Sequence, residues 1–224
     1  MKAVGYKLAH VLGGNDTLAD IELPTPIAKG HDLLVAVQAI SVNPVDTKIR
    51  SRVGGENGQY KVLGWDAVGT VQQVGELVTA YQPGDRVWYA GDISRPGSNA
   101  ELQLVDERIV GAAPKTISNL EAAALPLTAL TAWELLFDRL ALPMAAGKGK
   151  ALLVVGAAGG VGSILVQLAR RLTDVTVIAT AGRPQSKDWL CSLGAHHVID
   201  HHQSLSEQIS ALGLAGVELS LIHI

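Results

Sequence analysis

The chain has 224 residues, of which 48% are hydrophobic and 17% charged, so it can bury a sizeable core and does not have the composition of a disordered protein. Its formal net charge of −3 gives no reason to expect nucleic acid or an anionic membrane as a partner. The first residues lack the apolar core of a signal peptide, and no apolar run approaches the about twenty residues that a membrane span needs. We therefore expect a soluble, cytoplasmic protein. A single cysteine, Cys191, excludes an internal disulfide and any zinc site made only of cysteines.

Residues 1–118 have the texture of a β-rich domain. Short apolar segments at 33–37, 68–71, 86–89 and 100–105 are separated by Pro, Gly, Asn and Asp. Closely spaced strands with such turns predict an antiparallel barrel or sandwich. A short helix is expected within 42–50, after Asn43 and Pro44.

The pattern changes at Ser118, where we place the boundary between a domain of residues 1–118 and a domain of residues 119–224. Ser118 and Glu121 have the spacing of a capping box at a helix start. An alanine- and leucine-rich helical region follows as far as residue 140, and Pro126 is expected to interrupt it.

From Lys150 onward, strand and helix patterns alternate, which predicts an α/β domain with a parallel sheet and right-handed crossovers. We expect strands at 151–155, 175–180, 197–199 and 217–222, and helices at 160–172, 184–193 and 204–212. A complete dinucleotide-binding fold usually has six strands in two halves, so this domain is expected to be incomplete, as a product truncated at its C-terminus.

A glycine-rich turn joins the first of these strands to the first helix. Its spacing is Gly156-x-x-Gly159-x-x-Gly162, and Ala158 stands where the commoner dinucleotide pattern has its second glycine. Glycines here allow a tight turn and let bare backbone approach a pyrophosphate, while the helix N-terminus presents free N–H groups to the negative charge. The expected cofactor-binding residues of this turn are Gly156, Ala158, Gly159, Gly160, Val161 and Gly162.

The end of the second strand favours NADPH over NADH. NAD specificity usually requires Asp or Glu at this point, to accept from the ribose hydroxyls. Here the strand runs into Thr180, Ala181, Gly182 and Arg183, with Ser186 and Lys187 nearby, and none of these is acidic. The forked N–H groups of an arginine suit a 2′-phosphate. We expect Thr180, Arg183 and Lys187 to contact the cofactor.

Several motifs, in this order, resemble the medium-chain dehydrogenase/reductase superfamily, and within it the zinc-free NADPH:quinone oxidoreductase-like (zinc-type alcohol dehydrogenase-like) branch. They cover nearly the whole chain: Ser41-Val42-Asn43-Pro44-Val45-Asp46-Thr47-Lys48, Gly64-Trp65-Asp66-Ala67-Val68-Gly69, Pro83-Gly84-Asp85-Arg86-Val87, the run from Leu125 to Glu134, and the glycine-rich turn. The resemblance implies an N-terminal GroES-like β-barrel domain followed by a Rossmann doubly wound sheet. It also implies a homodimer for the full-length form.

The zinc enzymes of this superfamily hold their catalytic metal with Cys, His or Glu, and Cys or Asp. At the corresponding places this chain has Asn43 to Asp46 and then Trp65, and the stretch from Ile93 to Asn99 lacks the cysteines of a structural zinc lobe. Zinc needs about four ligands in a tetrahedral array, which these positions do not supply. The sequence therefore predicts no metal site.

The resemblance to quinone reductases places Asn43 and Asp46 near the nicotinamide and substrate, and Thr131 beside the nicotinamide. Asn43 would donate a hydrogen bond to a developing oxyanion. Each assignment has a structural alternative: Asn43 and Pro44 form a plain turn, and Asp46 caps the short helix. Tyr89 is the remaining catalytic candidate. It either lines the cleft in which the substrate would bind or belongs to the core of the barrel.

These observations favour an NADPH-dependent, zinc-independent oxidoreductase that transfers hydride to quinones or α,β-unsaturated carbonyls, acceptors that conjugation already polarises. The alternatives are an alcohol dehydrogenase and a non-catalytic NADPH-binding protein or inactive fragment. The pairs His196-His197 and His201-His202 match no compact zinc spacing and are expected to border the adenine end of the cofactor pocket. Cys191, within an apolar helix pattern, is expected to be a packed thiol.

Overall fold

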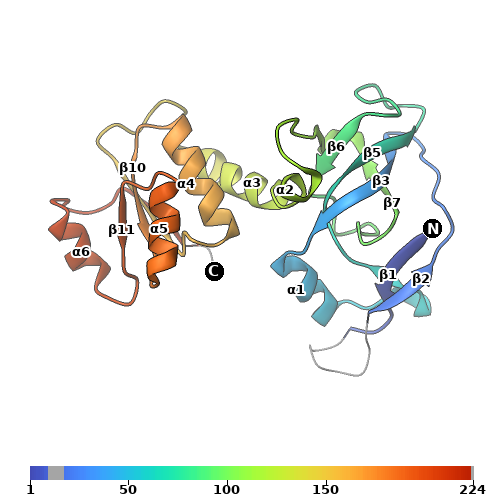
Figure 1. The fold of residues 1–224 in the computed structure, drawn as a ribbon, viewed down its shortest axis with the longest axis horizontal. Helices are drawn as coiled ribbons and strands as arrows, with labels where there is room; N and C mark the ends of the chain where they lie inside the picture. Colours follow the sequence, from blue (N-terminus) through green and yellow to red (C-terminus); the bar gives the residue numbers. More distant parts are fainter. Residues whose placement is uncertain (10–17, 223–224) are drawn as a thin grey trace. The chain divides into compact units, whose positions relative to one another are not determined.

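The structure is a computed structural model that describes residues 1–9 and 18–222. These residues form two compact units, Met1–Leu127 and Thr128–Ile224, and Figure 1 follows the chain through both. The sequence places the boundary nine residues earlier, after residue 118. The difference arises because the helix that follows Ser118 packs its buried Ala122 and Ala123 against Ala39 and Val68 of the first unit.

The first unit contains two antiparallel sheets. One has the strand order β2-β1-β4 and the other the order β7-β3-β5-β6-β8. The strands are β1 (Lys2–Tyr6), β2 (Ala19–Glu22), β3 (Asp32–Ser41), β4 (Lys61–Val62), β5 (Asp66–Val74), β6 (Arg86–Tyr89), β7 (Leu102–Asp106) and β8 (Val110–Ala112). The antiparallel β-rich unit that the sequence predicts is confirmed.

The core of this unit is made by inward-facing residues of the larger sheet. Leu33, Val35, Val71, Val87 and Val105 form one buried cluster. Helix α1 (Pro44–Arg52) begins with proline, whose missing N–H costs nothing at a helix start, and lies where a short helix is expected. Among the described residues of the unit, the other helical segments are the short turns η1 (Glu56–Gly58) and η2 (Glu107–Ile109) and the helix α2 (Asn119–Ala123).

Helix α3 (Pro126–Trp133) begins at the proline that ends the preceding helical run, as predicted. A π-helix, η3 (Glu134–Arg139), continues it, and the N–H of Leu140 donates to the carbonyl of Leu135. The capping box at Ser118 and Glu121 is also confirmed, because the Ser118 side chain accepts from Glu121 N–H and the Glu121 carboxylate accepts from Ser118 N–H.

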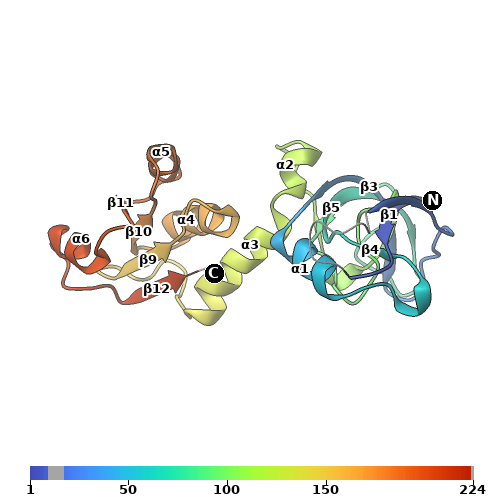
Figure 2. The same cartoon turned by 90° about the horizontal axis from the view of Figure 1, so that it is seen from below.

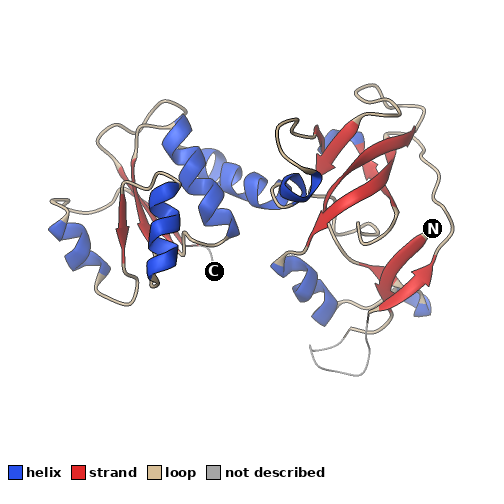
Figure 3. Ribbon diagram, viewed as in Figure 1, coloured by secondary structure: helices blue, strands red, loops and turns tan. Residues whose placement is uncertain are grey.

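The second unit is a parallel sheet with the strand order β11-β10-β9-β12. Its elements are β9 (Ala151–Val155), α4 (Gly160–Leu172), β10 (Thr176–Thr180), α5 (Pro184–Ser192), β11 (His197–Ile199), α6 (Leu205–Ala211) and β12 (Leu219–Ile222). Each expected strand and helix is present, with ends that differ by two residues or fewer (Figure 3).

Alternate residues of β9 enter the two faces of this sheet. Leu152 and Val154 pack with Leu165 of α4, and Leu190 of α5 joins the same cluster. Leu153 packs on the other face with Ile209 of α6. Figure 2 accordingly shows α4 and α5 on one side of the sheet and α6 on the other. Both faces of the central strands are buried, which explains the continuous apolar run that the sequence has there.

None of the helices formed by the described residues has both the length and the apolar character that crossing a membrane requires.

Candidate functional site

The glycine-rich turn leads directly from β9 into α4. Gly156 has a φ of +69°, a left-handed conformation in which other residues are strained. Its N–H donates to the Thr180 hydroxyl at 3.0 Å, so the end of β10 holds the start of the turn. Thr180 is fully buried, and its hydroxyl therefore positions the turn.

The other two glycines of the motif have different physical roles. A Cβ at Gly162 would lie 2.5 Å from both the Cα and the carbonyl oxygen of Ala157, so only glycine lets the helix approach the turn this closely. A Cβ at Gly159 would meet nothing nearer than the Gly156 carbonyl oxygen at 3.5 Å. Protein packing therefore does not require Gly159, and the open space beside it suits the approach of a ligand.

Helix α4 begins with unblocked N–H groups. Its N-cap is Gly159, and within the described residues no side chain caps this end of the helix. A thirteen-residue helix with an open N-terminus attracts an anion through its free N–H groups and its dipole. Val161 is buried in the core, so its contribution here comes from backbone alone.

Helix α3 lies against the same turn. A Cβ at Gly160 would lie 3.1 Å from the Cγ2 atom of Thr128. Thr131 comes three residues later and shares that face of the helix with Thr128. The structure thus brings Thr131, expected beside the nicotinamide, to the helix face that contacts the glycine-rich turn.

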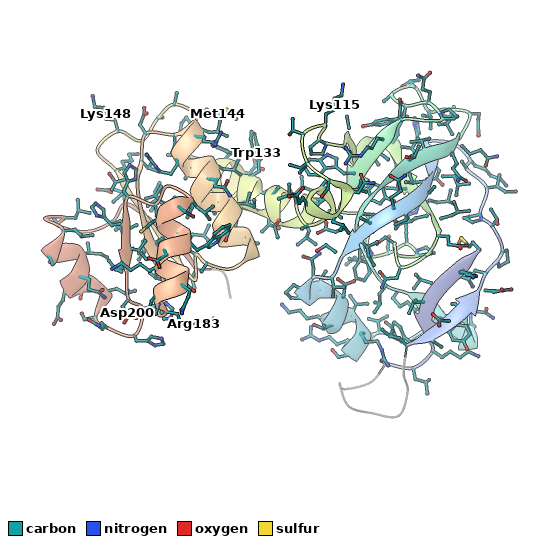
Figure 4. The ribbon with its side chains drawn as sticks, viewed as in Figure 1. Lys115, Trp133, Met144, Lys148, Arg183 and Asp200 are labelled. Atoms are coloured by element: carbon teal, nitrogen blue, oxygen red, sulfur yellow. The ribbon has the colours of Figure 1, made fainter. Side chains whose placement is uncertain are left out.

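A pocket of about 320 Å³ opens at the carboxyl ends of the strands. Figure 4 labels Arg183 and Asp200 at this end of the sheet. Lys187 is exposed and does not line the pocket. The lining residues come from the glycine-rich turn, the loop after β10 and the loop after β11: Gly156, Ala158, Thr180, Ala181, Gly182, Arg183, Ser186, His201 and His202.

In the first unit, Asn43 and Asp46 lie in one buried hydrogen-bond network. The Asp46 carboxylate accepts from Asn43 N–H at 2.7 Å and from Gly64 N–H at 2.9 Å. Asp46 therefore caps the start of α1 and ties the loop before β5 to it. This is the structural alternative that the sequence left open for Asp46.

Asp66 completes this network and was not selected from the sequence. Its side chain has no exposed surface, and its carboxylate accepts from the Asn43 amide at 2.9 Å and from Leu127 N–H at 2.8 Å. Burial raises the pKa of Asp66 to about 6, the two hydrogen bonds oppose this shift, and the nearby Asp46 charge adds to it. The sequence offered one signal for Asp66: an acid stands at the start of the apolar run Ala67-Val68. An acid that is buried with such a run needs hydrogen-bond partners.

Tyr89 lies in the buried cluster of the larger sheet with only 3% of its surface exposed. Within residues 1–9 and 18–222 its hydroxyl has no hydrogen-bond partner, and burial raises its pKa. Of the two interpretations of Tyr89, the structure favours the barrel core.

Trp65, which the sequence resemblance sets where zinc enzymes carry a histidine, is a buried core residue. Trp65 is 1% exposed, packs with Tyr6 and Leu63, and donates its indole N–H to the Asp92 carbonyl. Across the part of the chain that the structure describes, no three His, Cys, Asp or Glu side chains come together in a group that fits a metal ion. The donor set at Asn43 and Trp65 does not match a tetrahedral zinc site.

The expectation for Cys191 is wrong, because its side chain is exposed. Helix α5 buries Leu190 completely, whereas the neighbouring Trp189 is half-exposed. The apolar residues of this helix do not all face the sheet, and the thiol lies on the outer side.

Two family models match the chain: the alcohol dehydrogenase GroES-like domain over residues 29–115 and the zinc-binding dehydrogenase family over residues 160–224. A zinc-type alcohol dehydrogenase-like protein from Staphylococcus epidermidis is 41% identical over 220 residues, which are 97% of this chain. The chain belongs to the medium-chain dehydrogenase/reductase superfamily. The quinone oxidoreductase of Mus musculus, 33% identical over 90% of this chain, supports the quinone-oxidoreductase-like branch.

Solved structures of the superfamily have the same fold. A Rhizobium etli protein, described as a proposed zinc-dependent alcohol dehydrogenase, is 55% identical, with a TM-score of 0.91 over 98% of this chain and 64% of its own. The Escherichia coli quinone oxidoreductase, solved in complex with NADPH, is 28% identical, with a TM-score of 0.76 over 95% of this chain and 63% of its own. The first unit is thus GroES-like and the second Rossmann-like. The chain spans 65% of the length of the Staphylococcus epidermidis relative.

Proposed function

We propose that the protein is an NADPH-dependent, zinc-independent oxidoreductase that reduces quinones or α,β-unsaturated carbonyls. The observation that carries the proposal is the open N-terminus of α4, which follows a glycine-rich turn beside a pocket lined by Arg183. The pyrophosphate would lie against the N–H groups of α4, near Gly159. The adenosine half would enter the pocket at the ends of the strands.

The loop after β10 supports NADPH over NADH. Arg183 and Ser186 line the pocket, and none of the described residues that line it is acidic. A guanidinium forms charge-assisted hydrogen bonds with a phosphate, whereas an acid at this place would repel it. The Escherichia coli relative was solved with NADPH, which agrees with this choice.

Zinc independence rests on the side chains at the ligand positions. Trp65 is buried with its N–H already bonded to a backbone carbonyl, and Asn43 is bonded to Asp66. Several relatives carry zinc in their names, so the metal content of this protein has to be measured directly.

For the reaction itself, bound NADPH supplies a hydride. The chain's own contribution is to orient and stabilise. Asn43 has a second amide N–H besides the one that Asp66 accepts, and we assign it to the oxygen of the acceptor as negative charge develops there. Asp46 and Asp66 hold Asn43 in place. Thr131 would contact the nicotinamide of the bound cofactor, and Tyr89 is assigned no role in the chemistry.

The test combines metal analysis with turnover. The expected result is oxidation of NADPH in the presence of a quinone or an enone, unaffected by a chelator, by protein that contains far less than one zinc per chain. NADPH that binds but is oxidised by no such acceptor would contradict the proposed reaction and favour a non-catalytic binding protein. About one zinc per chain, with loss of activity on chelation, would favour the alcohol dehydrogenase alternative.

The homodimer and the cytoplasmic location stay predictions.

A further inference from the structure

Two histidines form one wall of the pocket in the second unit. His201 and His202 follow β11, both are exposed, and their ring centroids are 4.5 Å apart with a tilt of 58°. Both side chains line the pocket together with Arg183 and Ser186 from the loop after β10. Three side chains that carry or can acquire positive charge therefore border one pocket of about 320 Å³.

Both imidazole rings lie close to the same glycine, His202 through its Nε2 and Cδ2 atoms and His201 through its Nε2 atom. A Cβ at Gly182 would lie 2.4 Å from Nε2 of His202 and 3.1 Å from Nε2 of His201. Gly182 immediately precedes Arg183, so the two imidazole Nε2 atoms converge on the loop that carries the guanidinium. The absence of a side chain at Gly182 makes room for this arrangement.

When His201 and His202 are protonated, the charged groups near them leave this region with a net positive charge. On its own loop, Asp200 is the acid, and its carboxylate accepts from the backbone N–H of His202 at 2.8 Å. From the loop after β10 comes Arg183, which lines the pocket. Helix α5 carries Lys187 and Asp188, both exposed and of opposite charge, and neither lines the pocket.

We propose that His201 and His202 form, with Arg183, a phosphate-ester subsite whose preference for a 2′-phosphorylated nucleotide strengthens as the pH falls. This inference rests on the proposed function, because it names the residues that set its cofactor preference. Histidine is the side chain that ordinarily gains its charge between pH 8 and pH 5, so a phosphate beside two imidazoles is bound more tightly when they are protonated. Arg183 supplies the part of the preference that does not depend on pH, since arginine stays charged.

The dependence of affinity on the charge of the protein can be separated from the titration of the phosphate itself. The second pKa of a phosphate monoester is about 6, so the ligand stays mostly dianionic above pH 6.5. A fall in affinity between pH 6.5 and pH 8.5 therefore reports loss of positive charge from the protein. Comparison of 2′,5′-ADP with 5′-AMP cancels the contribution of the shared 5′-phosphate.

The experiment measures the dissociation constants of 2′,5′-ADP and 5′-AMP by calorimetry at several pH values between 6.5 and 8.5. For the wild-type protein, the ratio of the 5′-AMP constant to the 2′,5′-ADP constant should fall about tenfold across this range. In His201→Gln/His202→Gln the ratio should become nearly independent of pH, whereas Arg183→Gln should lower it at every pH and keep the slope. His31→Gln, a matched change in the first unit at a residue paired with Glu107, should behave like wild type.

Inorganic phosphate, added as a competitor, distinguishes free phosphate from a nucleotide as the preferred occupant. If inorganic phosphate binds as tightly as 2′,5′-ADP and displaces it, the assignment of the subsite to a nucleotide is overturned. A wild-type ratio that is constant with pH, or a slope that survives in the double variant, would overturn the role of the histidines while leaving the proposed function intact. Absence of any binding of 2′,5′-ADP and NADPH by the folded protein would overturn both.

Discussion

The carboxyl group of Asp66 lies wholly inside the first unit, and burial raises its pKa to about 6. An aspartate in the unfolded chain has a pKa near 3.9, so the folded state holds the proton more tightly. Between these two values the folded state binds more protons than the unfolded state, and this group's contribution to the free energy of unfolding falls as the pH rises. Above pH 6 the contribution becomes constant.

Replacement of this carboxyl tests that linkage. The free energy of unfolding of Asp66→Asn minus that of wild type should increase by about 1–1.5 kcal/mol as the pH rises from 5 to 8. The reason is that the variant side chain does not ionise. The measurement is chemical denaturation at a series of pH values. Asp188→Asn, at an exposed position on α5, provides the matched control with no such gain. Parallel pH profiles for wild type and Asp66→Asn would show that burial does not perturb this carboxyl.

A cofactor contact of Arg183 could be predicted from chemistry, because the residue follows a strand that ends without an acid and a guanidinium suits a phosphate. The structure shows that Arg183 lines a pocket, and the contact itself stays a prediction. Tyr89 stayed open between the cleft and the barrel core. Cys191 was expected to be packed and is exposed, because an apolar neighbour pattern does not fix the side of the helix on which the thiol lies. Asp66 escaped selection because its partners, Asn43 and Leu127, are distant in sequence and meet only in the fold.

Two glycines of the turn before α4 have different roles that substitution can separate. A methyl group at Gly162 would overlap backbone atoms of Ala157 at 2.5 Å, whereas one at Gly159 would have only ordinary contacts. Gly162→Ala should therefore destabilise the second unit by about 1–3 kcal/mol or more, because backbone atoms have to shift.

Gly159→Ala is the matched substitution with the opposite profile. Its φ of −74° suits alanine, so the free energy of unfolding should change by less than about 1 kcal/mol. Its affinity for NADPH should fall about tenfold or more, because the methyl group stands where bare backbone would meet the pyrophosphate. Thermal denaturation and NADPH titration of both variants provide the readouts. Wild-type NADPH affinity in Gly159→Ala would place the pyrophosphate elsewhere.

The elements themselves were largely predictable because local signals agree with the fold. Pro126, Pro184 and the capping box at Ser118 and Glu121 mark helix starts through backbone chemistry alone. Ser204 and Glu207 have the same spacing but form only half of a capping box, in which the serine side chain accepts from Glu207 N–H. The π-helix η3, in which Leu136 is buried, had no sequence signal.

For the whole molecule, alternation of strands and helices was sufficient to predict a parallel sheet, because few topologies satisfy that pattern. The division into units was harder to locate. Composition changes at Ser118, but α2 is held to the first unit by buried Ala122 and Ala123, so the compact unit ends at Leu127. Composition does not reveal the boundary between the two units, because the short helix α2 packs on the unit that precedes it in the chain.

We propose that the second unit binds NADPH at the turn from Gly156 to Gly162 and selects it through Arg183. The most direct test is a fluorescence titration of the 224-residue chain, which has four tryptophans, with NADPH and NADH. We expect saturable binding that is tighter for NADPH, and a loss of about 10- to 100-fold in NADPH affinity in Arg183→Gln with little change for NADH. Tighter binding of NADH, or binding of neither nucleotide by a chain shown to be folded, would contradict the proposed cofactor site.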